Sequence, residues 1–338
     1  MASPGARRKL SALSRKLGIA VVLAAVACAV YASAAGAASG KVRVWTIHYQ
    51  ASDEQRRAAY VVLPSWYGPK NNPPIPLIIS PHGRGLSGHS NARLWGSLPA
   101  DGWFAVVNPD GLSRYSWGAV EQIADLARMP KILERTLPWL RVDTQRIYAF
   151  GGSMGGQETL LLLARYPHLL AGAAAFDSVA DFALQYRSFR ALTCRGSCLR
   201  VWNGPLGIGL QSLARRQIGG SPQQVPRAYA ARSPITYARN IAFSCVPLQM
   251  WWSSADRVVR DQRRQSERLF LEVKRLNPNA PIQAFSGLWI HSDEMRAQTR
   301  LPLALATFGL LPPSANVATR ALHVVPAPPT ASDCSRPG

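Results

Sequence analysis

The fold is decided by the stretch Gly151-Gly152-Ser153-Met154-Gly155-Gly156. It follows directly on a short apolar run at residues 147–150 and opens a helical pattern over residues 154–166. This is G-x-S-x-G between a strand and a helix, where a tight turn exposes the serine and small residues allow close packing. A phosphate-binding loop is the alternative, but the G-K-[ST] ending of such loops does not follow. The pattern therefore predicts a nucleophilic serine at the end of a strand.

Working outward, short apolar runs alternate with helical patterns along most of the chain. Strands are expected at residues 42–49, 58–63, 77–80, 103–107, 147–150, 171–176, 247–252 and 282–285, and helices at residues 92–100, 120–140, 154–166, 262–276 and 297–310. This order predicts an α/β fold with a mostly parallel central sheet and helices on both faces. Functional residues of such sheets gather at the carboxyl ends of the strands. Residues 178–245 fit no strand-helix unit and predict a cap inserted over those ends.

A serine hydroxyl is a poor nucleophile at neutral pH, so Ser153 needs a base oriented by a third group. His291 follows the last expected strand, in Gly287-Leu288-Trp289-Ile290-His291, and should emerge at the same sheet edge as Ser153. His82 is expected to brace a loop instead of transferring protons. The other four histidines are expected on an early strand, in a loop, at a helix end and near the tail: His48, His89, His168 and His323. We therefore predict that His291 is the base. The alternative is that His291 is only a histidine in a surface loop.

The orienting acid is expected after another strand of the same sheet. Asp256 follows the strand at residues 247–252, and Asp177 ends the strand at residues 171–176 and is its main rival. The order Ser153, Asp256, His291 is the chain order of enzymes that carry the serine on this kind of turn. We therefore predict Asp256 as the acid.

The remaining parts of a catalytic site can also be assigned. The loop Pro81-His82-Gly83-Arg84-Gly85 follows the strand at residues 77–80, and its glycines allow the backbone to approach a substrate carbonyl. The backbone N–H groups of Arg84 and Met154 are the expected oxyanion donors. The aromatic residues Tyr115, Trp117 and Trp252 are candidates for the substrate pocket, although simple packing is the alternative for each.

Together these motifs resemble the α/β-hydrolase superfamily over residues 41–310, and within it the secreted esterase and prolyl-oligopeptidase-like branch. The resembling stretches are Pro81-His82-Gly83, Asn108-Pro109-Asp110-Gly111, Arg146-Ile147-Tyr148, and Arg232-Ser233-Pro234-Ile235-Thr236-Tyr237 before Asp256-Arg257-Val258-Val259. Relatives often have His-Gly before the acid, where this chain has Trp251-Trp252-Ser253-Ser254-Ala255. That departure changes the wall of the site and leaves Asp256 in place.

The resemblance implies a serine hydrolase that cleaves carboxylic esters through an acyl-enzyme, without metal or organic cofactor. Its substrate would be a small-molecule or polymer ester, including an anionic one. A serine peptidase of the prolyl-oligopeptidase-like type and a non-catalytic binding protein on the same fold are the alternatives. No acidic pair suggests a clamp for a peptide amine, and no triad member is missing, so both alternatives rank lower.

Residues 1–38 have the pattern of a secretory signal peptide. Five cations precede the apolar stretch at residues 18–30, and small residues follow at 32–38. We expect cleavage and secretion, and an uncleaved membrane anchor is the alternative. No later segment is apolar for long enough to span a membrane. Residues 39–324 are then the catalytic domain, and residues 325–338 form a Pro-rich tail.

Four cysteines remain after the signal: Cys194, Cys198, Cys245 and Cys334. An even number in an exported chain predicts two disulfides, for which three pairings exist. Cys194 with Cys198 would close a short loop and would leave Cys245 to tie the tail to the body. A zinc site is the competing interpretation, but no second close Cys or His pair supports it.

The net charge of +21 is unevenly distributed. Signal cleavage would remove five cations and leave +16. Residues 182–255 contain nine arginines and no lysine, aspartate or glutamate, so nine of these charges fall largely in the expected cap. Nucleic acid is not expected as a partner because no binding motif accompanies the charge. A basic cap that attracts an anionic substrate and a merely solvated basic surface remain the two interpretations.

Overall fold

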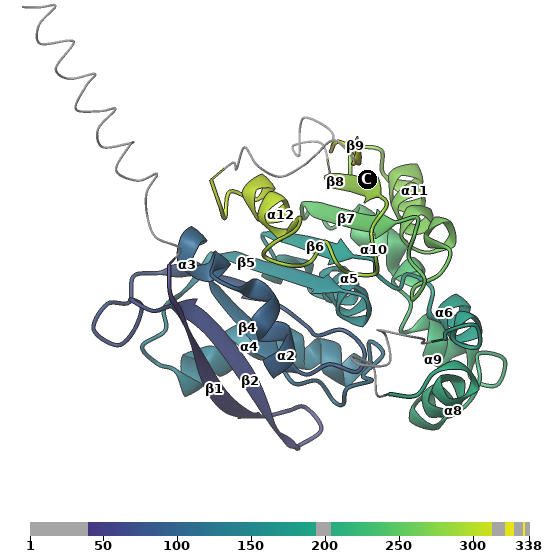
Figure 1. Cartoon of the computed structure of the whole chain (residues 1–338), viewed down its shortest axis with the longest axis horizontal. Coiled ribbons are helices and arrows are strands. Elements are labelled where there is room, and N and C mark those ends of the chain that lie inside the picture. Colours follow the sequence, from purple (N-terminus) through teal and green to yellow (C-terminus); the bar gives the residue numbers. More distant parts are fainter. Residues whose placement is uncertain (1–39, 194–203, 313–321, 328–333, 335–338) are drawn as a thin grey trace, which may run out of the picture. The chain divides into compact units, whose positions relative to one another are not determined.

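The computed structural model describes residues 40–193, 204–312, 322–327 and 334. Within them, the strands form a nine-stranded sheet in the order β1-β2-β4-β3-β5-β6-β7-β8-β9 (Figure 1). The strands are β1 Val42–Gln50, β2 Arg56–Pro64, β3 Ile75–Ile79, β4 Ala105–Pro109, β5 Val142–Gly152, β6 Gly172–Phe176, β7 Leu248–Ser253, β8 Ile282–Gly287 and β9 His323–Val325. All eight expected strands are present.

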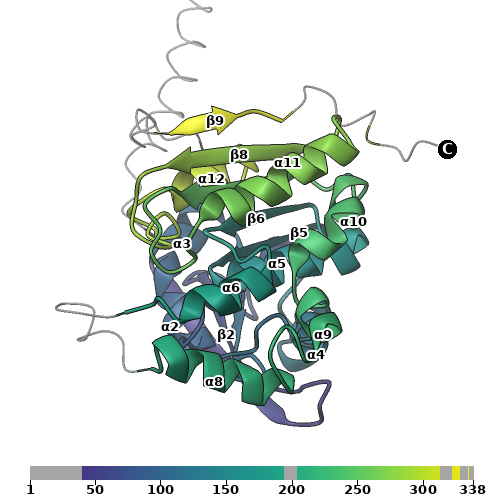
Figure 2. The ribbon, with the colours of Figure 1, turned by 90° about the vertical axis from the view of Figure 1, so that its right-hand side faces the viewer.

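The sheet is mostly parallel, as predicted. Strands β3 to β8 pair in parallel, whereas β1 pairs antiparallel with β2, and β2 antiparallel with β4. Strand β9 adds an antiparallel edge beside β8, which Figure 2 shows at the end of the sheet. This strand is not expected from the sequence, because three residues between turn-rich stretches carry almost no periodicity. It crosses the expected domain boundary after residue 324.

Helices cover both faces of the sheet, because the strands are buried on both sides and need apolar partners on each. Along β3, Leu77 and Ile79 face one core cluster and Ile78 faces the other. The first cluster is built with α4 (Val120–Thr136), α5 (Met154–Arg165) and α11 (Ser266–Leu276). The second is built with α2 (Gly88–Ala92), η1 (Arg93–Trp95), α3 (Leu98–Gly102) and α12 (Leu301–Thr307).

The expected helix at residues 92–100 is interrupted in the structure. Gly96 separates η1 from α3 with a φ of +49°, a conformation that ends regular helical geometry. The expected helix at residues 297–310 is shorter and runs only as α12. It begins with Pro302 in its first turn and ends before Gly309, whose φ of +67° does not continue a helix. The helix at residues 262–276 begins as the short η4 (Gln262–Arg264) before α11.

The segment expected to form a cap is helical in its described part. It contains α6 (Phe182–Phe189), α8 (Gly207–Ile218), α9 (Pro226–Ala230), η3 (Pro234–Tyr237) and α10 (Ala238–Ala242). Helices α6, α8 and α9 lie together in Figures 1 and 2 and share a third apolar cluster with Trp117 and Met154. Because Met154 directly follows Ser153, this cluster packs these three helices beside the expected nucleophile.

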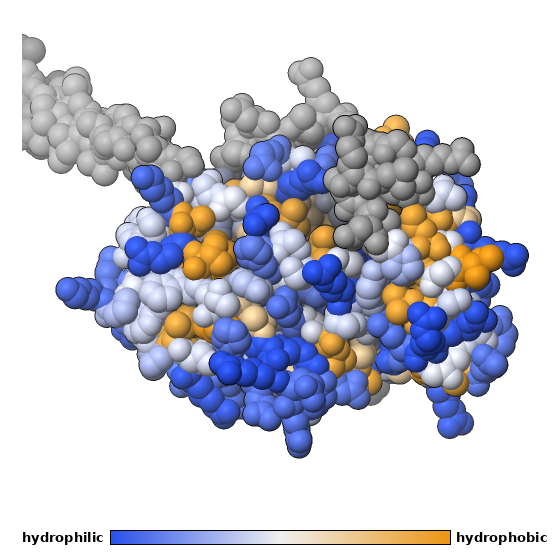
Figure 3. Space-filling view, turned by 60° about the horizontal axis from the view of Figure 1, so that its bottom comes forward, coloured by the Kyte–Doolittle hydropathy of each residue, from blue (hydrophilic) through white to orange (hydrophobic). Residues whose placement is uncertain are grey.

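The surface and the helices of the described residues bear on whether the chain could span a membrane. On the face shown in Figure 3, hydrophilic residues predominate and apolar ones form small, separated patches. No helix within the described ranges has the length and apolar character needed to cross a membrane. The signal peptide expected at residues 1–38 lies outside the described residues.

The predicted disulfides are not seen in the described part of the chain. Cys194 and Cys198 lie outside it, and Cys245 and Cys334 are free thiols. These two thiol residues are nevertheless neighbours, with Cys245 Sγ 2.6 Å from the backbone oxygen of Cys334. Asn277 Nδ2 lies 3.6 Å from Cys334 Sγ, so the tail contacts the body at this point. A Cys245–Cys334 disulfide stays a prediction.

Candidate active site

Ser153 lies on the sharp turn between β5 and α5. Its φ of +60° places it in a region that non-glycine residues seldom adopt, and this strain turns the side chain away from the strand. The flanking glycines are required by close approach. A Cβ on Gly151 would lie 2.3 Å from Gly155 O, and one on Gly155 would lie 2.2 Å from Pro81 O. The turn therefore has the geometry that the sequence predicted for a nucleophile.

The structure brings His291 and Asp256 together. His291 Nδ1 lies 2.8 Å from Asp256 Oδ2, and the Asp256 side chain is almost fully buried. Backbone N–H groups of Val258 and Val259 donate to Asp256 Oδ1 at 2.7 and 3.1 Å. Burial lowers the pKa of His291, but the adjacent Asp256 carboxylate outweighs burial, so the pKa of the imidazole is raised above its ordinary value. The pair thus has the arrangement of an oriented base.

Among the described residues, no hydrogen bond joins the His291 ring to Ser153. Within the described residues, His291 Nε2 contacts Ser292 Oγ at 3.5 Å. Ser292 in turn packs against the nucleophile turn, because a Cβ on Gly152 would lie 3.2 Å from its Oγ. Ser292 thus links the imidazole to the turn that carries Ser153, and catalytic hydrogen bonds are often long before substrate binds.

The loop expected to supply an oxyanion donor lies next to Ser153. A Cβ on Gly83 would lie 3.9 Å from Ser153 Cβ, which places the following residue, Arg84, at the nucleophile. Met154 begins α5, so its N–H has no acceptor within the helix. His82 braces the loop: its Nδ1–H donates to Gly83 O at 2.9 Å, and its Nε2 accepts from Gly111 N at 3.3 Å.

The three aromatic candidates for the pocket have different places. Trp117 lines a small pocket together with Ser153 and Arg84. Tyr115 packs against Trp117, with ring centroids 5.7 Å apart, and does not line that pocket. Trp252 packs in the core, 6.1 Å from the Phe270 ring, because its position along β7 turns it to the face covered by α4, α5 and α11.

Two buried carboxyl groups around the site are not foreseen as functional. Glu158 accepts hydrogen bonds from Ser116 Oγ and from Gln122 Nε2 and so holds the loop that carries Trp117. Burial raises its pKa to about 7. Glu294 is fully buried three residues after His291. A sequence signal exists for Glu158, an acidic residue within the apolar helical pattern of α5, but not for Glu294, which stands among polar loop residues.

Asp177, the rival acid, lies close to the pair without replacing Asp256. The ligand atoms of Asp177, Asp256 and His291 lie within 4.8 Å of one another, a spacing that a metal ion could use. The oxygens of both carboxylates, however, already accept hydrogen bonds from backbone N–H or side-chain donors. These three groups therefore fit a hydrogen-bonded catalytic network better than a metal site.

Comparisons with known proteins bear on the fold. No family model and no curated protein matches the sequence. Among solved structures, the Staphylococcus aureus fluorophosphonate-binding serine hydrolase F is similar with a TM-score of 0.57 and 14% identity, over 80% of this chain and 99% of that one. A puromycin hydrolase matches with a TM-score of 0.56 and 16% identity, over 83% of this chain and 41% of that one.

The Pyrococcus horikoshii acylaminoacyl peptidase matches with a TM-score of 0.55 and 17% identity, over 79% of this chain. This chain spans only 41% of the length of that peptidase. The order of the strands, the turn at Ser153 and these structural likenesses agree, and they show that this chain has the α/β-hydrolase fold.

Proposed function

We propose that the protein is a secreted serine hydrolase that cleaves carboxylic esters through an acyl-enzyme. The observation that carries the proposal is the 2.8 Å contact between His291 and Asp256 beside the strained turn of Ser153. Solved structures of the same fold include an S-formylglutathione hydrolase, an esterase and a serine hydrolase, which supports the reaction class.

The mechanism follows from the positions of these groups. Ser153 Oγ attacks the ester carbonyl while His291 Nε2 takes its proton, and Asp256 stabilises the imidazolium that forms. The N–H groups of Arg84 and Met154 hold the developing oxyanion. His291 then protonates the leaving alkoxide, and a water molecule repeats the sequence to release the acid. A small rotation of His291 from Ser292 toward Ser153 completes the proton path.

The side chain of Arg84 supports an anionic substrate. It lines the same pocket as Ser153, together with Trp117, Phe189 and other residues that include no aspartate or glutamate. Its guanidinium carbon lies 6.0 Å from the Phe189 ring centroid. Burial lowers the pKa of Arg84 to about 10, so the group stays charged at neutral pH. We infer that this positive charge favours esters that carry a carboxylate close to the scissile bond.

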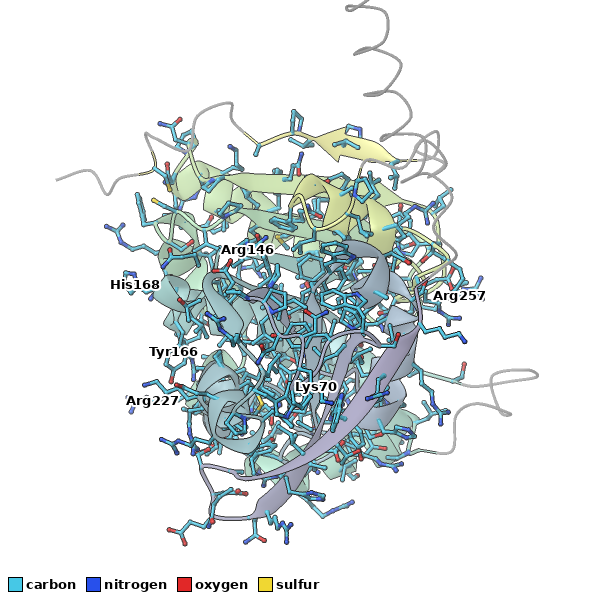
Figure 4. All side chains as sticks on the ribbon, turned by 90° about the vertical axis from the view of Figure 1, so that its left-hand side faces the viewer. Lys70, Arg146, Tyr166, His168, Arg227 and Arg257 are labelled. Carbon is cyan, nitrogen blue, oxygen red and sulfur yellow. The ribbon has the colours of Figure 1, made fainter. Side chains whose placement is uncertain are left out.

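The arginines of the cap support this preference less directly. Figure 4 shows Arg227 of the cap pointing outward at one side of the molecule. Exposed charges more than about 10 Å apart are largely screened at physiological salt. We therefore assign the preference to Arg84. An Arg84→Met variant keeps the backbone N–H, so it should lose about tenfold in kcat/KM for a dicarboxylic monoester and little for a neutral ester of equal length. Equal losses on both esters would contradict this assignment.

The reaction class is tested with a fluorophosphonate probe and a substrate panel. The wild type should be labelled at Ser153 and should hydrolyse acetyl, longer acyl or feruloyl esters faster than aminoacyl anilides. Ser153→Ala should lose both properties, and Ser212→Ala on α8 should keep them. Faster anilide cleavage would favour a peptidase. Two of the similar solved structures are an acylaminoacyl peptidase and a dipeptidyl peptidase. Absence of labelling would favour a non-catalytic binding protein.

A further inference from the structure

Two buried carboxyl groups lie behind the His291–Asp256 pair and have no role in the mechanism above. Asp177 follows β6, and its carboxylate lies within 4.8 Å of the ligand atoms of both His291 and Asp256. Glu294 lies three residues after His291. Buried charge is costly, so two extra carboxyl groups at this place need a physical explanation.

Asp177 connects the two loops that carry the pair. Its Oδ1 accepts a hydrogen bond from Ser253 N at 2.7 Å, and Ser253 ends the strand that leads to Asp256. Its Oδ2 accepts from Ser292 N at 2.8 Å and from Trp289 Nε1 at 3.1 Å, on either side of His291 in the sequence. The carboxylate therefore fixes the main chain next to His291 and carries a negative charge close to the imidazole.

Glu294 is in a different state. The residue is 0% exposed, and neither of its carboxyl oxygens has a hydrogen-bond partner among the described residues. Burial, followed by the charge of Asp177, raises the pKa of Glu294 well above its usual value. Because burial without hydrogen-bond partners penalises the charged form, this carboxyl group favours its protonated state, and Asp177 is the charge that acts on it.

We propose that Asp177 and Glu294 form a carboxyl pair behind the triad, in which ionised Asp177 positions His291 and stabilises its imidazolium while Glu294 keeps its proton. Asp177 is thus a positioning residue that acts through His291. The proposal rests on the proposed role of His291 as the base. The charges that face His291 are Asp256 and Asp177, which favour the imidazolium, and Arg84, which opposes it.

The environment of Asp177 supports this division of roles. Burial raises the pKa of Asp177 to about 6, with His291 lowering it and Asp256 raising it. Asp177 is thus ionised above that pH, whereas burial without hydrogen-bond partners favours the protonated form of Glu294. A negative charge on Glu294 would be repelled by that of Asp177.

The first test is the pH dependence of kcat/KM for a neutral aryl ester in Asp177→Asn. Its acid limb reports the pKa of the base in the free enzyme. Loss of the Asp177 charge should move that limb down by about one pH unit and lower kcat about tenfold. Asp293→Asn is the matched control, because it removes a carboxylate from the same loop that pairs with Arg296 at the surface. An unmoved limb in a folded Asp177→Asn protein would overturn the proposal.

The second test needs neither substrate nor a change at Asp177. Infrared difference spectra of wild type against Glu294→Gln at pH 8 should show the C=O stretch of a protonated carboxyl in the wild type alone. A carboxylate band in its place would overturn the assignment of the proton to Glu294. Because this readout is independent of activity, it distinguishes failure of the carboxyl pair from failure of the esterase proposal, which would appear as missing ester hydrolysis in the wild type.

Discussion

The loops after β6 and β7 each carry a buried aspartate, yet the two carboxylates have different surroundings. Asp256, after β7, touches His291 directly and accepts the remaining hydrogen bonds from its own loop and from Gln262. Asp177, after β6, does not hydrogen-bond to the imidazole and instead joins the loops that carry Asp256 and His291. We infer that a carboxylate at such a strand end can support a catalytic histidine in two ways. It can hydrogen-bond to the imidazole, as Asp256 does, or it can hold the main chain of the loops around it, as Asp177 does.

Of the variants proposed, Asp256→Asn should lose the most activity. The imidazole would lose its partner for the Nδ1 proton, so kcat should fall by about 10⁴-fold. Asp261→Asn is the control, because that carboxylate lies in the same loop and is 45% exposed. Ester hydrolysis under saturating substrate measures the loss. If Asp177→Asn were the more damaged protein, Asp177 and not Asp256 would be the acid.

A double-mutant cycle of Asp256→Asn and Asp177→Asn measures whether the two carboxylates act together on His291. When Asp256 is already asparagine, Asp177 is the remaining carboxylate of the cluster within 4.8 Å of His291. The Asp177→Asn change should then cost several-fold more than it does in the wild type, a coupling of about 1 kcal/mol. Single-turnover rates of the four proteins give the coupling. Strictly additive losses would mean that the two carboxylates act independently.

The smallest expected effect concerns stability at Glu294. Its raised pKa means that the folded state keeps a proton that the unfolded state releases above about pH 4.5, so this group loses stability as pH rises. Asp177 acts in the same direction only up to its pKa of about 6. As pH rises above about 4.5, Glu294→Gln should therefore gain on the wild type by about 1 kcal/mol per pH unit until Glu294 ionises in the folded protein. Urea unfolding at several pH values measures this, and parallel curves would contradict a buried protonated Glu294.

Much of the fold was predictable from sequence because it depends on local patterns. Buried parallel strands are continuous apolar runs, and the turn at Ser153 has a spacing that few other structures use. The residues of the proposed triad follow from their positions after strands, since strand ends meet at one sheet edge. By contrast, the broken helix at Gly96 and strand β9 depend on tertiary packing that no short window records.

The remainder of the site was less predictable for a similar reason. Trp117 and Trp252 are indistinguishable as single aromatic residues, and only the register of the sheet turns Trp252 into the core. Asp177 was recognised only as a rival acid, because its hydrogen bonds reach residues 76 and 115 positions away. Glu294 depends on burial, which a single acidic residue in a loop does not reveal.

Mass-spectrometric mapping of the fluorophosphonate adduct, together with its rate of formation, tests directly whether Ser153 is an activated nucleophile. We expect one adduct, on Ser153, that forms fastest in the wild type, more slowly in Asp177→Asn and slowest in Asp256→Asn. An adduct on a different serine, or equal rates in all three proteins, would contradict the assignment of Ser153, His291 and Asp256 as a working triad framed by Asp177.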